Sequence, residues 1–152
     1  MSSRPTPLPQ ARPEALQTWL RLARVYQKIQ RRLDRILSNC DITLPQFDVL
    51  ANLGMSDGIT QQELAGRLLV TKGNVCGLLD RMEAAELVER KPSPNDRRAN
   101  HLHLTAKGRA ALQAAFPIHL GLIEQCMAPL TATDQARLNS LLNKIESSDC
   151  AS

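Results

Sequence analysis

The stretch TQQELAGRLLVTKGNVCGLLDRMEAAELVERKPSPNDRRANHLHLTAKG, residues 60–108, contains two short helical patterns followed by two strand-like runs. Thr60 and Glu63 form the T-x-x-E pattern of a capping box, which predicts the start of the first helix. Thr71 is the predicted N-cap of a second helix of about 14 residues. The strand-like runs are 86–90 and 100–104, and the second alternates polar and apolar residues as a half-buried strand does.

The second of these helices has two distinct faces when its residues are placed at about 100° per position. The predicted inward face comprises Val75, Leu78, Leu79 and Met82. The predicted outward face is small and polar, and it comprises Gly73, Asn74, Gly77, Asp80 and Arg81. A bracing helix, a second helix with a polar outer face and a hairpin together predict a winged helix-turn-helix, in a fold that is mainly α with a small β-hairpin.

Helical patterns flank this central lobe on both sides. Apolar residues recur at three- and four-residue steps over about 25 residues from Glu14, and a further helix opens at Leu44-Pro45 and ends at Gly54. After the hairpin a helix runs to about Met127 with a kink or break expected at Pro117, and Thr133 is the predicted cap of the last helix. The predicted organisation is a mobile Pro-rich arm (1–13), an N-terminal dimerisation helix (14–40), a winged helix-turn-helix lobe (41–105), C-terminal dimerisation helices (106–147) and a tail (148–152).

Composition and charge narrow the class of protein. The chain of 152 residues is 43% hydrophobic and 22% charged, which is ordinary for a globular protein and excludes disorder throughout. No apolar run approaches the roughly 18 residues of a membrane helix and no secretory signal opens the chain, so a cytoplasmic location without membrane contact is expected. The net charge is +4, and residues 90–98 contain four cationic residues and one acid. Such a basic segment is a candidate phosphate contact, although a solvated loop is the alternative.

Nothing in the sequence indicates catalysis. It contains no nucleophile elbow, phosphate-binding loop, H-E-x-x-H motif or dinucleotide-binding glycine pattern, so we expect no enzyme activity and no cofactor. His101 and His103 share one face of a predicted strand without an evident third ligand, which favours surface histidines over a metal site. The four cysteines are scattered without a C-x-x-C pair, as free thiols would be.

Residues 44–108 resemble the MarR (multiple antibiotic resistance regulator) family of bacterial transcription factors. The resemblance includes LPQFDVLANLG from Leu44, and its most specific part is Asp96-Arg97-Arg98 followed by Leu104-Thr105-x-x-Gly108. It implies a homodimer in which the first and last helices of both subunits interlock. Such a dimer would present two recognition helices to successive major grooves of a pseudo-palindromic site on double-stranded DNA, as a repressor that an effector releases.

The resemblance also implies which residues contact DNA. The residues that match the recognition surface are Thr71, Lys72, Gly73, Asn74, Gly77 and Arg81. Arg97 and Arg98 match the wing tip, which enters the minor groove, and Asp96 matches the acid that holds those arginines. Thr60 and Gln61 start a helix and are candidate phosphate contacts. One departure is Glu86, where relatives usually have glycine. A left-handed backbone at Glu86 would cost about 1 kcal/mol, and the alternative is a rebuilt turn.

The resemblance to the MarR family also implies control by an effector, through one of two candidate mechanisms. A small aromatic or anionic ligand would bind between the dimer helices and the DNA-binding lobe, where Trp19, Tyr26 and Phe47 are candidate lining residues, with plain core packing as the alternative. A thiol-based redox switch would use Cys40 or Cys76. The alternative from another class is a winged-helix protein-interaction module that does not bind DNA, and the adjacent Arg97 and Arg98 argue against it.

Overall fold

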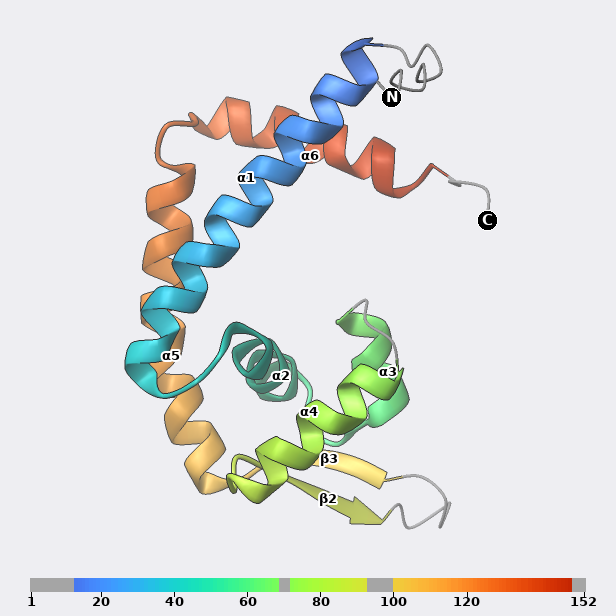
Figure 1. The fold of residues 1–152 in the computed structure, drawn as a ribbon, viewed down its shortest axis with the longest axis vertical. Coiled ribbons are helices and arrows are strands. Elements are labelled where there is room, and N and C mark those ends of the chain that lie inside the picture. Colours follow the sequence, from blue (N-terminus) through green and yellow to red (C-terminus); the bar gives the residue numbers. More distant parts are fainter. Residues whose placement is uncertain (1–12, 69–71, 93–99, 149–152) are drawn as a thin grey trace, which may run out of the picture.

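A computed structural model describes residues 13–68, 72–92 and 100–148 of the chain. Its long helices are α1 (Pro13–Leu37), α5 (Ala106–Met127) and α6 (Ala132–Glu146), and a 3-10 turn, η1 (Ser38–Cys40), follows α1. The shorter elements are α2 (Leu44–Met55), β1 (Ile59–Thr60), α3 (Gln61–Arg67), α4 (Lys72–Ala84), β2 (Val88–Pro92) and β3 (Asn100–Leu104). Figure 1 shows the long helices as a frame beside a smaller lobe built from α2, α3, α4 and the strands. The mainly helical fold with a small β-hairpin is thus confirmed.

The hydrophobic core lies inside the lobe and extends to the C-terminal end of α1. Leu50 and Leu53 of α2, Leu79 of α4 and Leu102 of β3 are all at most 1% exposed. Leu37, the last residue of α1, joins the same cluster with no exposed surface. These side chains form one close-packed cluster, which fixes how α2 and α4 lie on the sheet. Because Leu37 of α1 belongs to the same cluster, the lobe is attached to the C-terminal end of α1.

The sheet has three antiparallel strands in the order β1-β3-β2. Val88 pairs with Leu104 and Pro92 with Asn100 across the hairpin, whereas Ile59 of β1 pairs with Leu102 on the other edge of β3. Strand β1 is too short for a periodicity to predict it. The first hairpin strand was predicted at 86–90, but it begins at Val88, because the backbone at Glu86 is left-handed and belongs to a turn.

Three details of the helices differ from the sequence prediction. The last helix is capped by Thr131, not Thr133, because Thr131 and Asp134 form the reciprocal capping box. Helix α2 continues one residue past Gly54 to Met55. A kink or break was expected at Pro117, and there is no break, since α5 runs as one helix through that proline.

Candidate nucleic-acid interface

Helix α3 starts with the capping box that the sequence predicted. The Thr60 Oγ1 accepts the Glu63 backbone N–H at 3.2 Å, and the Glu63 carboxylate accepts the Thr60 N–H at 2.7 Å. These hydrogen bonds from Thr60 hold the pKa of Glu63 below its usual range, so the carboxylate is ionised at neutral pH. Gln61 follows and is half-buried. A negative charge therefore sits beside Thr60 and Gln61, whose contact with a DNA phosphate stays a prediction.

Helix α4 divides its residues as the helical wheel predicted. Val75, Leu79 and Met82 are completely buried against the lobe, whereas Asn74 and Arg81 are exposed. A Cβ atom at Gly77 would lie 3.7 Å from the Arg81 guanidinium, so the missing side chain leaves the surface beside Arg81 low. Lys72 and Gly73 form the first turn of the helix. The outer surface of α4 is therefore narrow, polar and open, which suits close approach to a groove.

Five of the predicted DNA-contact residues lie wholly or partly outside the described part of the chain. Thr71 of the recognition segment and Asp96, Arg97 and Arg98 of the wing lie outside the described residues. The side chain of Lys72 is likewise outside what the structure describes. What the structure does describe is the base of the wing, where β2 ends at Pro92 and β3 begins at Asn100.

Arg90 connects the base of the wing to α4. Its guanidinium lies 2.7 Å from a carboxylate oxygen of Asp80 and 2.6 Å from one of Glu83, and its side chain is only 17% exposed. The backbone N–H of Arg90 also donates to Glu83 at 3.3 Å. Burial alone would lower the pKa of Arg90, but the hydrogen bonds and charges of Asp80 and Glu83 raise it above its ordinary value. This ion pair joins α4 to β2, the first strand of the hairpin.

The turn between α4 and β2 is clamped by the start of α5. Glu86 has a φ of 59°, so its backbone is left-handed and the turn is not rebuilt. The Thr105 hydroxyl donates to the carbonyl of Glu86 at 2.6 Å, and the Lys107 ammonium donates to that of Ala85 at 2.8 Å. These bonds occupy carbonyl groups at the end of α4 and stabilise a backbone that a non-glycine residue adopts only at a cost. The wing, α4 and α5 therefore meet at one fixed junction.

The two strand histidines hold the turn before β1 against β3. The His103 Nδ1 lies 3.0 Å from a carboxylate oxygen of Asp57, and the His101 Nδ1 contacts the carbonyl of Gly58. The hydrogen bond to His103 holds the pKa of Asp57 below its usual range. Within the described residues no group of three or more histidine, cysteine or acidic side chains is arranged to hold a metal ion. These histidines thus have structural partners in the fold.

The three candidate effector-pocket residues lie in different surroundings. Phe47 is buried in the core and stacks on the His119 ring with centroids 4.3 Å apart, whereas Trp19 and Tyr26 of α1 are about three-fifths exposed. Tyr26 lines a cavity of about 360 Å³ between α1, α2 and α4. The polar side chains of that cavity are Gln30, Asp48, Asn74 and Arg81. Burial raises the pKa of Asp48.

The two candidate redox cysteines lie on separate elements. Cys76 is exposed on α4 with its Sγ 4.0 Å from a carboxylate oxygen of Asp80, and Cys40 is half-buried in η1. Neither forms a disulfide in the structure. A thiol switch at either position stays a prediction.

The ion pair of Arg90 was not predicted from the sequence. Asp80 and Glu83 are separated from Arg90 by a turn whose geometry no local pattern specifies. Charge complementarity between the end of a helix and the following strand was the one available signal.

Helices α3 and α4 each bury one side in the lobe, α4 has a polar outer surface, and a hairpin follows it. This arrangement defines a winged helix-turn-helix protein. The MarR family model matches residues 41–99. The multiple antibiotic resistance protein MarR of Escherichia coli K12 is 37% identical over 122 residues, which are 80% of this chain and 85% of that protein. This chain belongs to the MarR family.

Solved structures agree with this assignment over nearly the whole chain. A cysteine-to-serine mutant of E. coli MarR, in complex with operator DNA, matches with a TM-score of 0.81 and 34% identity over 87% of this chain and 95% of that one. The transcriptional repressor CouR, bound to a 23-mer DNA duplex, matches with a TM-score of 0.79 and 28% identity over 93% of this chain and 99% of that one. Among the described helices, none is both long and apolar enough to cross a membrane.

Proposed function

We propose that this protein is a transcriptional regulator that binds specific double-stranded DNA as a homodimer and represses transcription until an effector releases it. The observation that carries the proposal is the exposed polar face of α4, which Arg90 joins to β2 at the base of the wing. Similarity to MarR in complex with operator DNA and to CouR bound to a duplex supports it. Members of this family are regulators and not enzymes, which agrees with the absence of any catalytic motif in the sequence.

The proposed DNA contacts follow from position on the lobe. Residues of α4 and the segment before it would enter the major groove: Thr71, Lys72, Gly73, Asn74, Gly77 and Arg81. Asn74 would read a base edge because its amide pairs well with adenine, and Lys72 would contact guanine or a phosphate. Arg97 and Arg98, positioned by Asp96, would enter the minor groove, and Thr60 and Gln61 would lie against the backbone.

Uncovered apolar surface on the long helices supports the homodimer. Helix α6 has no buried residue, and Leu138, Leu141 and Ile145 are all exposed on it. On α1 the exposed apolar residues include Leu16 and Trp19. A groove of about 480 Å³ lies between α1 and α6. Six apolar side chains and four polar ones line it. Apolar faces of this extent are normally covered, and a second copy of α1 and α6 would cover them.

The cavity beside Tyr26 is the proposed effector site. It joins α1 and α2 to Asn74 and Arg81 of the recognition helix, so a ligand there would touch both the frame and the DNA-reading element. The Arg81 guanidinium suits a carboxylate and the Tyr26 ring suits an aromatic group. Occupancy would compete with DNA for Arg81, which is a direct route to release.

Fluorescence anisotropy tests DNA recognition. A duplex from upstream of the protein's own gene is compared with a scrambled duplex across a salt series. A preference of about 10³-fold or more with a steep salt slope is expected of a specific regulator. Equal binding to both duplexes at all salt concentrations contradicts sequence-specific regulation from that site. No binding to either duplex would favour a protein-interaction module.

A further inference from the structure

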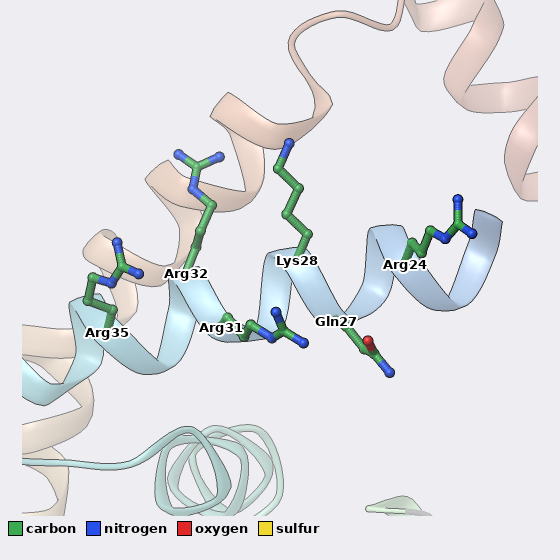
Figure 2. Close-up of a pocket in the computed structure, with 6 residues that line it drawn as sticks. All are labelled: Arg24, Gln27, Lys28, Arg31, Arg32 and Arg35. Carbon is green, nitrogen blue, oxygen red and sulfur yellow. The ribbon is translucent and has the colours of Figure 1, made fainter. Parts of the chain in front are cut away.

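One face of α1 carries a row of cations with no part in the lobe's core. Arg24, Lys28, Arg31, Arg32 and Arg35, hereafter the α1 basic stripe, are exposed and together with Gln27 line a shallow groove of about 410 Å³. Figure 2 shows these side chains along successive turns of the helix, with Arg31 and Gln27 lower on it than the others. In that view Arg24, Lys28, Arg32 and Arg35 extend on the side of α1 away from α2. The stripe is thus separate from the α4 surface.

The stripe follows the helical repeat closely. Steps of three and four residues place its members within a sector of about 100° and along about 16 Å of helix axis. Leu33 and Leu37, which pack into the core, point from a different sector of the same helix. Arg32 lies at the edge beside α5, where its Nη1 is 3.4 Å from the Cys126 Sγ. The cations therefore form one continuous surface at roughly one-turn intervals.

The charges of the stripe are not neutralised within the described part of the chain, where no ion pair includes any of its five members. Helix α1 has two acids: Glu14 lies at its start, and Asp34 accepts the backbone N–H of Leu44 at 3.2 Å. Like charges three and four residues apart destabilise a helix, and the helix dipole favours cations only in the last turn, where Arg35 lies. A bound polyanion would offset this repulsion.

We propose that the α1 basic stripe binds the phosphodiester backbone of a second segment of duplex DNA, apart from the one read by α4. The five members of the stripe offer closely spaced donors and charge, which is what phosphate contacts require. Val25, an exposed apolar residue beside it, lines the groove between α1 and α6 that a second copy is proposed to cover. A protein partner would need a buried apolar or aromatic anchor among the charges, and an anionic membrane would need apolar side chains beside them to insert. Arginine makes up four of the five positions and binds phosphate oxygens in a forked geometry.

The proposal rests on the proposed function only in that DNA is the polyanion this protein would meet at high local concentration. Because the stripe and α4 face different directions, one dimer would hold two duplexes. Regulators with two such sites can bridge separated stretches of DNA.

A bridging measurement tests the stripe. The upstream duplex is immobilised on beads, loaded with the full-length protein and washed, and a labelled non-operator duplex is then added between about 50 and 200 mM salt. The test variant is Arg24→Gln/Arg31→Gln, and the matched control is Arg137→Gln/Lys144→Gln, which removes the same charge from exposed positions of α6. A further variant, Arg24→Lys/Arg31→Lys, keeps the charge, and circular dichroism compares helix content among all of them.

The parent protein is expected to capture the second duplex. The glutamine variant should lose about tenfold in affinity for it and about two units of salt slope, and both the control and the lysine variant should stay within about twofold. Binding to the immobilised upstream duplex should be unchanged in every variant, so a failure of the proposed function would show separately as a parent protein that does not prefer that duplex. Salt slopes on scrambled DNA still compare the variants in that case.

Three results would overturn the proposal. Absence of capture by the parent protein removes the second site, and an equal loss in the stripe and control variants makes the effect one of net charge. Binding to vesicles containing phosphatidylserine that disappears in the stripe variant, without capture of a second duplex, would assign the stripe to a membrane surface.

Discussion

Gly108 of α5 lies so close to the backbone of Leu87 that a Cβ atom added to it would be 1.9 Å from the Leu87 carbonyl oxygen and 3.0 Å from its carbon. The carbonyl of Leu87 also accepts the backbone N–H and the hydroxyl of Thr105. The first turn of α5 is therefore pressed against the turn that leads from α4 into the wing. The absence of a side chain at one position allows the frame and the DNA-binding lobe to meet.

The first prediction concerns this contact. Gly108→Ala should destabilise the protein by about 1–3 kcal/mol, because the added methyl meets backbone atoms that cannot rotate away. Urea unfolding followed by circular dichroism measures the change. Gly66→Ala and Gly121→Ala are matched controls in open space on helices, and they should stabilise by about 0.5–1 kcal/mol. A Gly108 variant as stable as the controls would contradict the close approach.

The second prediction concerns the link between α4 and the wing. Arg90→Gln should lower stability by about 1–2 kcal/mol, a value reduced for the solvent exposure of Asp80 and Glu83. It should also weaken DNA binding, because the hairpin is no longer held at its angle to α4. Lys91→Gln breaks an exposed pair with Glu89 and should cost at most about 0.5 kcal/mol.

A double-mutant cycle separates the ion pair from other effects of Arg90. Combining Arg90→Gln with Glu83→Gln should recover a coupling free energy of about 0.5–3 kcal/mol in urea unfolding. Strict additivity of the two substitutions would show that the 2.6 Å contact contributes nothing to stability.

The third prediction is a pH dependence. The hydrogen bond from His103 lowers the folded-state pKa of Asp57 below 3.8, so this carboxylate stabilises the fold fully at neutral pH. That stabilisation is lost as the pH falls below about 4 and through the folded-state pKa. It is small because the Asp57 side chain is 58% exposed.

Unfolding free energies at several pH values between about 2 and 7 give the test. Asp57→Asn should be slightly less stable than the parent at neutral pH, and the difference should shrink as the solution becomes acidic. A difference that stays constant over this range would exclude titration of Asp57 as its cause.

The fourth prediction concerns the wing. Arg98→Ala should reduce affinity for the upstream duplex by about tenfold or more, which corresponds to the ~1–3 kcal/mol of a good DNA contact, and leave the oligomeric state unchanged. Arg137→Ala on α6 is the matched control and should bind like the parent. Lys72→Ala should lower affinity, and Asn74→Ala should blur sequence preference, because only a base-reading group discriminates. Selection of identical sites with identical strength by both variants would mean that α4 is oriented differently.

The fifth prediction concerns the apolar face of α6. Leu141→Glu should raise the dissociation constant of the dimer by about 100-fold or more, because an unpaired carboxylate would be buried against the second copy. Sedimentation equilibrium measures the change. Asn143→Glu lies on the opposite side of the same helix and should leave association as it is. A dimer that tolerates Leu141→Glu does not use this face.

Local patterns predicted most of the fold. The capping box at Thr60, the inward side of α4 and the alternation in β3 each depend on residues within one or two turns of each other, and the structure confirms all three. The prediction that Thr133 caps the last helix was wrong, because Thr131 forms a capping box with Asp134 three residues later.

Hydrophobic periodicity and capping act between near neighbours in the chain, so the sequence was enough to predict the helices, the hairpin and the polar face of α4. Only the tertiary structure decided that Ile59 pairs with Leu102, that Arg90 joins α4 to the wing, and that Phe47 packs against His119 and does not line the cavity beside Tyr26. Those relationships depend on how whole elements pack when their apolar faces are buried together. Local sequence patterns do not predict that packing, because it joins residues that are far apart in the chain, such as Phe47 and His119.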